Sequence, residues 1–198
     1  SNVTNMEGLF SGASSFNKDI SSWNVSNVTS MKYLFDDTNV FNQNISLWNV
    51  SNVTNMEYMF KNASNFNFDI GAWDVSNVTS MRSMFEDASN FNGNIDNWVI
   101  TNVTSIRAMF KGSTSFNSNI INWDTSNVLS FYETFRDAIN FDHDIEYWPI
   151  SDNLQQSQLF YMFRDATKML TRYLNNSFVQ NSDGTVYIQF FKVKVYIG

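Results

Sequence analysis

The 198-residue sequence contains no cysteine and only one histidine. The absence of cysteine excludes disulfide bonds and thiol chemistry, so packing and hydrogen bonds must hold the fold together. With one imidazole and no thiol, the usual set of nucleophile, base and orienting residue cannot be assembled, although a pair of carboxylates stays open. We therefore predict that the protein is not an enzyme and uses no cofactor.

Positive charge and long apolar runs are also scarce. Twelve Lys and Arg residues stand against 19 Asp and Glu, which gives a formal net charge of −7. This balance argues against nucleic acid or an anionic membrane surface as the main partner. No stretch approaches the ~20 apolar residues of a membrane span, so we predict no membrane insertion within this chain. A composition that is 43% hydrophobic and 17% aromatic nevertheless predicts a folded protein.

One hexapeptide returns every 25 residues, first as SNVTNM and then as SNVTSM, SNVTNM, SNVTSM and TNVTSI. Six units align without a gap, and a seventh carries an insertion around residues 153–158; the units start at residues 1, 26, 51, 76, 101, 126 and 151. The shared pattern is S-N-V-T-x-M-x-x-[ML]-F-x-x-A-x-x-F-N-x-[DN]-I-x-x-W-[ND]-V. Such repetition predicts a solenoid in which each unit needs its neighbours for stability.

Each unit predicts one short helix and one short strand. In the third unit, Met56, Met59, Phe60 and Ala63 have the spacing of one apolar helix face, and the recurrent Thr predicts the helix N-cap. The I-x-x-W-x-V segment places Trp and Val two residues apart, as in a strand with one buried face. Stacked units would align these strands in a parallel sheet, which makes the predicted class an α/β solenoid.

The strand segment looks like the L-x-x-L-x-L core of leucine-rich repeats. The complete unit, W-[ND]-V-S-N-V-T-x-M-x-x-M-F-x-x-A-x-x-F-N-x-[DN]-I, resembles the repeats of about 25 residues in bacterial surface proteins and Mycoplasma lipoproteins, which are grouped with BspA-like leucine-rich-repeat proteins. The resemblance covers Ser1 to about Leu170. It implies a right-handed, leucine-rich-repeat-like superhelix of about seven coils and a life outside the cell or on the surface of a cell or particle. The function of that family is largely unknown, and it supplies no catalytic residues.

The C-terminal segment departs from the repeat, so we divide the chain into a solenoid over residues 1–170 and a capping β-hairpin over residues 171–198. The turn signal NSDG at 181–184 and the alternating residues after it predict the hairpin. No equivalent cap, leader or initiator Met precedes Ser1, which suggests a processed product or a fragment. Alternatively, another molecule covers the first coil in a head-to-tail homo-oligomer. The strand residues that would take part in such assembly are Val186, Ile188, Val193, Val195 and Ile197.

The outward residues beside each Trp and Val vary between units, as a recognition face would, although a neutral solvated face gives the same pattern. The candidate ligand contacts are Asn49, Asp74, Asn97, Asn122, Asp124 and Tyr147. We predict adhesion or recognition through this rigid, repetitive face, with a protein or glycan on another surface as partner. The alternative is a self-assembling subunit of an extracellular fibre or sheath, and binding of ice or polysaccharide through repeated hydroxyl and amide columns ranks third.

Other polar patterns favour structural roles. His143 between Asp142 and Asp144 lacks the converging ligands of a metal site, so we predict a solvent-facing side chain and no metal. Two columns of Asn and Asp, beginning at Asn17 and Asp19, predict side chains that satisfy turn backbone groups, with calcium ligation as the alternative. Sequons recur because NVS and NVT are repeat positions, and the candidate glycosylation sites are Asn2, Asn24, Asn49, Asn62 and Asn175.

Charges alternate in sign between successive units at two repeat positions. The first series is Glu7, Lys32, Glu57 and Arg82, and the second is Asp36, Lys61, Glu86 and Lys111. Equivalent positions are neighbours in a stack, so alternation predicts attractive contacts between units in a fixed register. An exposed pair contributes only ~0–1 kcal/mol, so it indicates register rather than a source of stability.

Overall fold

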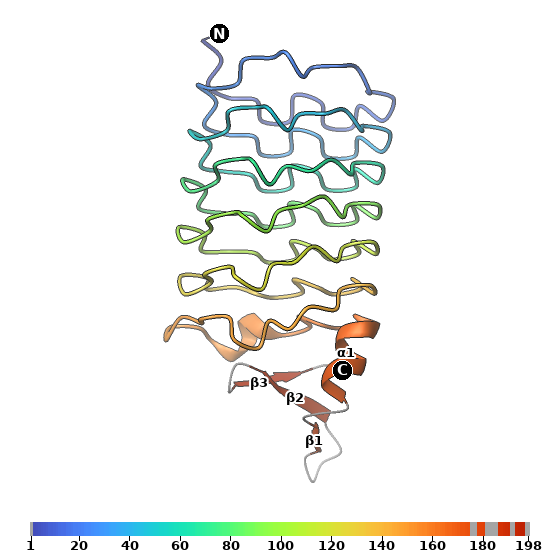
Figure 1. Cartoon of the computed structure of the whole chain (residues 1–198), viewed down its shortest axis with the longest axis vertical. Coiled ribbons are helices and arrows are strands. Elements are labelled where there is room, and N and C mark those ends of the chain that lie inside the picture. Colours follow the sequence, from blue (N-terminus) through green and yellow to red (C-terminus); the bar gives the residue numbers. More distant parts are fainter. Residues whose placement is uncertain (1, 175–177, 181–185, 191–192, 197–198) are drawn as a thin grey trace.

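The structure, a computed structural model, describes residues 2–174, 178–180, 186–190 and 193–196. The 25-residue units lie one above another along the long axis of the molecule, and the C-terminal elements lie beyond the last of them (Figure 1). These elements are the 3-10 helix η1 (Gln156–Leu159), the helix α1 (Thr167–Leu174) and the strands β1 (Phe178–Gln180), β2 (Val186–Phe190) and β3 (Val193–Tyr196). The repeats therefore form the stack, and the C-terminal helices and strands lie at one end of it.

Residues 2–155 contain no helix and no strand, although the sequence predicts one of each in every unit. The residues with helical spacing form a succession of turns instead. In the second unit the Leu34 N–H donates to the Met31 carbonyl at 3.1 Å, whereas the Phe35 N–H donates to the Met59 carbonyl of the next unit at 2.8 Å. Because alternate N–H groups bond to the neighbouring unit, the i to i−4 bonds of an α-helix do not form.

The turns need backbone with positive φ at the eighth and twelfth residues of a unit. Glycine occupies this region without steric cost at Gly8 (φ 63°) and Gly112 (φ 68°). Tyr33 and Ala108 adopt it as well, with φ of 57° and 52°, which costs an L-residue roughly 1–2 kcal/mol. The chain accepts this strain because the turn exposes one N–H to the adjacent unit while it points the apolar side chains inward.

Single parallel bridges join equivalent residues of successive units. They run Asn5 to Ser30, Ser30 to Asn55, Asn55 to Ser80, Ser80 to Ser105 and Ser105 to Ser130. The I-x-x-W-x-V segment, where the sequence predicts a strand, forms a turn before the Trp and irregular backbone after it. The solenoid class, its leucine-rich-repeat likeness and its right-handed sense stay predictions, because single bridges between turns do not define layers of strands and helices.

Columns of aromatic rings fill the interior. Phe60 stacks on Phe35 and on Phe85 of the adjacent units, with ring centroids 5.5 Å apart in both cases, and on Phe66 of its own unit at 4.1 Å. Stacked aromatic pairs of this kind contribute about 0.5–1.5 kcal/mol beyond the area that they bury. Each ring is therefore covered mainly by its copies, so a single unit has no complete core.

The C-terminal strands form an antiparallel sheet in the order β1-β2-β3, with Phe178 opposite Ile188 and Ile188 opposite Val195. This sheet has three strands where the sequence predicts a two-stranded hairpin, and α1 extends to Leu174, past the predicted boundary at residue 170. Strand β3 contacts η1. Of the predicted assembly residues, Val186, Ile188, Val193 and Val195 lie in β2 and β3, and Ile197 lies outside the described residues.

Candidate recognition groove

Three of the six predicted ligand contacts close turns. The Oδ1 atoms of Asn49, Asp74 and Asp124 each accept the N–H of the serine two residues later, at 3.0–3.1 Å. The pKa values of Asp74 and Asp124 lie below the usual carboxyl value. The larger cause is a hydrogen bond from the hydroxyl of Ser76 or Ser126, and the smaller is a bond from the N–H of the same serine. These side chains therefore have a structural task, and their exposed atoms are only partly available to a ligand.

The other three predicted contacts are exposed, and none of them makes a hydrogen bond within the described part of the chain. They are Asn97, Asn122 and Tyr147, the last of which is 85% exposed. All six residues lie in two columns along the stack, so the structure keeps them on one side. Of these residues, Asn97 lines a hollow in the surface.

That hollow is a groove of about 600 Å³ over the corner of the second, third and fourth units. Its lining is mostly polar, with one half-buried aromatic ring, Phe68, and the small residues Gly71 and Ala72. The side chains that matter most for its chemistry are Asn44, Ser46, Asn67, Phe68, Asp69 and Asn97. Amides, a hydroxyl, a carboxylate and a ring thus meet in one place. We call this hollow the corner groove.

The corner groove lies where one hydrogen bond of the third unit differs from the equivalent bond in the other units. In the second and fourth units, the Oδ1 atoms of Asn44 and Asn94 accept the N–H two residues later, at 3.0 and 2.9 Å. Asp69 instead accepts the Asn94 N–H of the next unit at 2.8 Å. Gly71 and Ala72 follow, where other units carry larger residues, and both line the groove. A different hydrogen bond and two small side chains together leave the corner recessed.

The two Asn and Asp columns bond to the backbone, as the sequence predicts. In the first column the Asn42 N–H donates to Asn17 Oδ1 at 2.9 Å, and the Asn92 N–H donates to Asn67 Oδ1 at 2.8 Å. Each side chain therefore fixes the corner of the following unit. Within the described residues, no cluster of three or more His, Cys, Asp or Glu side chains could hold a metal ion.

His143 does not face solvent as the sequence predicts. The residue is half-buried, and its Nε2 lies 2.9 Å from the Asn117 carbonyl oxygen of the preceding unit. The neighbouring Asp142 is paired with Arg172, whose Nε lies 2.7 Å from Oδ1. The histidine belongs to the same contacts between units as the equivalent Gln43, which donates to Asn17. The prediction overlooked that a long polar side chain at this position reaches the previous turn.

The repeated hydroxyl and amide columns also bond between units. Thr29 Oγ1 donates to the Thr4 carbonyl at 3.1 Å, and Asn52 Nδ2 donates to the Ser26 carbonyl at 2.7 Å. The same two bonds recur in the following units. One donor of each of these side chains is therefore used in a contact between units.

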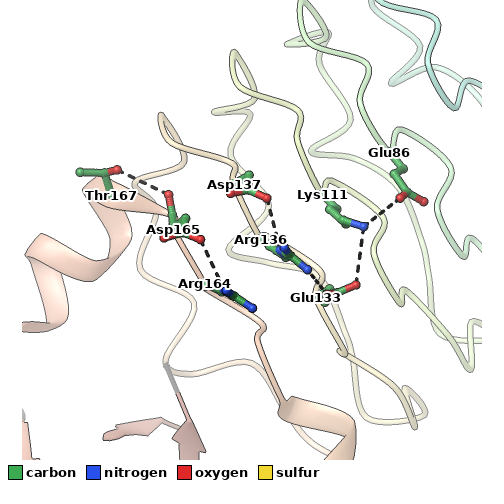
Figure 2. A network of polar contacts seen from close by, with 8 residues as sticks. All are labelled: Glu86, Lys111, Glu133, Arg136, Asp137, Arg164, Asp165 and Thr167. Atoms are coloured by element: carbon green, nitrogen blue, oxygen red, sulfur yellow. Dashed lines mark hydrogen bonds and ion pairs between the residues drawn. The ribbon is translucent and has the colours of Figure 1, made fainter. Parts of the chain in front are cut away.

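Ion pairs link the units along another side of the stack, and they confirm the predicted alternation of charge for Lys61, Glu86 and Lys111. Glu86 pairs with Lys61 at 3.7 Å and with Lys111 at 3.1 Å, and Lys111 also pairs with Glu133 at 3.8 Å. Figure 2 shows this series continuing through Arg136 to Asp137. The pairs from Lys61 to Glu133 join neighbouring units, as a fixed register requires, whereas Glu133, Arg136 and Asp137 belong to one unit.

Lys32 and Glu57 form the corresponding pair of the first series, at 3.0 Å. Burial tends to raise the pKa of Glu57, but hydrogen bonds from Ser80 and Lys32 outweigh it, and the pKa lies below the usual glutamate value. The hydrogen bond to Glu57 in turn raises the pKa of Lys32. Both groups are therefore charged at neutral pH, and each holds the other in place.

The candidate glycosylation sites differ in accessibility. Asn2 is exposed, and so are Asn24 and Asn49, which use Oδ1 to close turns. Asn62 Nδ2 donates to Asp37 Oδ1 at 2.7 Å, so a glycan there would break a contact between units. Asn175 lies outside the described residues.

Comparison with known proteins identifies a family. The family described as "Mycoplasma protein of unknown function, DUF285" matches residues 1–98 and again residues 88–190. The chain belongs to this family. The double match agrees with the repeated organisation of this DUF285 protein, since each match covers several 25-residue units. No curated protein and no solved structure matches the chain. Within the described residues, no helix has the length and apolar character needed to cross a bilayer.

Proposed function

We propose that this DUF285 protein is a non-enzymatic module for adhesion or recognition, of the BspA-like type, exposed outside a cell or on the surface of a cell or particle. Its partner is a protein or glycan on another surface. The stack is the scaffold, and the partner contacts side chains that project from it at several points.

The separation of constant from variable columns carries this proposal. Constant side chains bond from unit to unit: the Trp73 indole donates to the Ile45 carbonyl at 3.1 Å, and the other bonded columns follow the same 25-residue period. Variable side chains project next to them, as Leu47 and Tyr147 do, with exposed fractions of 90% and 85%. A scaffold that repeats while its exposed positions vary is the arrangement that repeat proteins use for binding.

The chemistry of the polar groups supports a binding role as well. Carboxylates such as Glu86 and Asp142 are held in ion pairs, and Asp74 closes a turn. His143 is bonded to the backbone. A general acid or base needs a group that is free to exchange a proton with a substrate, whereas these groups serve the scaffold.

Binding of the labelled intact chain to cell surfaces and to arrays of proteins and glycans tests the proposal. We expect saturable binding that excess unlabelled chain displaces. Treatment of the surface with protease or with periodate then assigns the partner to protein or carbohydrate. If the chain shows saturable binding to none of these surfaces or arrays, the proposal is wrong.

Self-assembly into a fibre or sheath is the second candidate, and the first unit favours it. Trp23 is 41% exposed, whereas the equivalent Trp73 is 3% exposed. Trp23 lines an apolar hollow of about 370 Å³ with Val3, Met6 and Leu9. Another unit of the same repeat would cover this hollow, whether it belongs to the same polypeptide or to a second copy. Filaments that grow with concentration, seen by light scattering and electron microscopy, would support assembly, and a persistent monomer would oppose it.

A further inference from the structure

We infer that the corner groove binds a neutral carbohydrate chain. The inference rests on the proposed recognition function and names its ligand class. It depends on three properties of the groove: hydrogen-bond donors held in fixed directions, acceptors beside them, and one aromatic ring.

The donors are amide groups whose orientation is fixed. Asn44 and Asn94 accept backbone N–H groups at Oδ1, and Asn67 Oδ1 accepts the Asn92 N–H at 2.8 Å. Since each amide is planar, a fixed Oδ1 also fixes the direction of Nδ2, which carries two N–H donors. Groups that are already ordered lose little conformational entropy when a ligand binds. The groove therefore presents several donors at low entropic cost.

The acceptors stand next to these donors. Asp69 uses one carboxylate oxygen for the Asn94 N–H at 2.8 Å, and its other oxygen makes no hydrogen bond within the described chain. Asn97 adds an amide whose donor and acceptor have no partner there, and Ser46 adds a hydroxyl. A sugar hydroxyl both donates and accepts, so it needs mixed partners of this kind within a short distance.

Phe68 supplies an apolar surface. It is half-buried, packs against the core and lines the groove. The same repeat position holds Lys18, Gln43, Gly93, Ser118 or His143 in other units, so the benzyl ring occurs only in the unit that forms the groove. A Cβ at Gly93 would lie 2.2 Å from the Phe68 carbonyl oxygen. The backbone of the third unit therefore leaves no room for a side chain at this position of the fourth unit. We infer that a C–H face of a sugar ring packs against Phe68.

Charge selects neutral sugars over acidic ones. No Lys or Arg lines the groove, which contains the Asp69 carboxylate, and the chain has a net charge of −7. A sulfated or carboxylated sugar would meet repulsion with no cation to offset it. The volume of about 600 Å³ lies within the range of roughly 300–1,000 Å³ that is typical of small-ligand sites. An oligosaccharide, rather than a single large protein surface, therefore fits the hollow.

The test is calorimetric titration of the intact chain with three neutral hexasaccharides, from cellulose, starch and chitin, and with a sulfated heparin hexasaccharide as the charged comparison. Ala72→Tyr fills the groove at a position that tolerates tyrosine, because the equivalent Tyr147 is 85% exposed. The matched control is Ser22→Tyr, which has the same repeat position in the first unit, outside the groove. Asn97→Ala removes the amide that has no partner in the described chain.

We expect at least one neutral hexasaccharide to bind and the heparin fragment not to bind. Ala72→Tyr should weaken binding by about tenfold or more and Asn97→Ala by roughly two- to tenfold, the range of one hydrogen bond, while Ser22→Tyr leaves it unchanged. The melting temperatures of all three variants should stay within about 2 °C of the parent, as for exposed substitutions.

Two results would overturn the inference: no neutral hexasaccharide binds, or one binds equally to the parent and to Ala72→Tyr. If the chain still shows saturable binding to cell surfaces, the recognition function survives and only the carbohydrate groove is wrong. If it binds no surface and no sugar, both proposals fail.

Discussion

Replacement of one buried tryptophan tests how strongly each unit depends on its neighbours. Trp73 is 3% exposed and stacks on Phe60 with ring centroids 6.4 Å apart. Its indole N–H donates to the carbonyl of Ile45 in the preceding unit at 3.1 Å. Trp73→Ala therefore removes a core ring and a hydrogen bond between units in one step.

The structure sets the size of the effect. A buried Trp→Ala substitution costs about 3–5 kcal/mol. The Ile45 carbonyl also accepts the Trp48 N–H at 3.1 Å, so loss of the indole donor leaves no carbonyl without a partner and adds little to this value. Trp23 has the same position in the first unit but is 41% exposed, so Trp23→Ala should cost only about 1–2 kcal/mol in lost burial. The two variants remove the same side chain from the same repeat position and differ in the neighbour that covers it.

Urea unfolding followed by circular dichroism measures the total free energy, and hydrogen exchange locates the loss. Because a repeat array unfolds in nearest-neighbour fashion, protection should fall in the second, third and fourth units of Trp73→Ala and only near the first unit of Trp23→Ala. Equal free-energy losses in the two variants would refute the reasoning, since they would show that contact with the preceding unit adds nothing.

Three further substitutions test the turns and the polar contacts. Ala108→Gly should cost about 1–2 kcal/mol less than Ala88→Gly, because both side chains are buried but only Ala108 has positive φ, at 52°; equal costs in urea unfolding would exclude strain at this turn. Asp36→Asn should stabilise the protein at pH 7 by less than about 1 kcal/mol, because Oδ1 is buried without a hydrogen bond and burial raises the pKa of this carboxyl. The gain in stability should shrink as pH falls through the raised pKa of Asp36, because the parent carboxyl then becomes neutral as well. A gain that does not change with pH would contradict this explanation. Glu57→Gln should cost about 1 kcal/mol through loss of the half-buried pair with Lys32. The pKa of Glu57 is lower in the folded protein than in the unfolded chain. The contribution of the pair to stability is therefore complete above the unfolded pKa of about 4.3 and is lost as pH falls through the folded pKa. The unfolding free energies of parent and variant should converge at low pH.

The sequence was informative wherever one position repeats. Period and alternation predict that Lys61, Glu86 and Lys111 are neighbours, and the ion pairs between them confirm it. The apolar positions of the third unit are buried as expected, with Met59 and Phe60 fully covered. Side chains at equivalent positions of a regular stack meet each other, so the pattern alone determines these contacts.

The secondary structure was harder to predict, because a series of turns can bury the same spacing of residues as a short helix. The signal that distinguishes them lies at the twelfth repeat position, where Gly, Asp and Asn recur, as Gly12, Asp37, Asn62 and Asp87 do. These residue types tolerate positive φ better than others, and all four have it. A helix of seven or eight residues would have little reason to keep them there.

The corner groove depends on a local choice that composition does not reveal. Asp69 has the same repeat position as Asn44, yet it accepts an N–H from the next unit instead of its own. The only sequence signal is the pair Gly71 and Ala72, which are small where other units carry larger residues. The repeated positions therefore predict the scaffold, and the departures from the repeat at Gly71 and Ala72 mark the corner groove.

A crystal structure of the chain soaked with the tightest-binding neutral hexasaccharide tests the central claim most directly, namely that recognition takes place at the irregular corner of an otherwise regular stack. We expect sugar density in the corner groove, with hydroxyl groups on Asp69 and Asn97 and a ring against Phe68. Sugar bound along the regular Thr and Asn columns, or no bound sugar under saturating conditions, would contradict the claim.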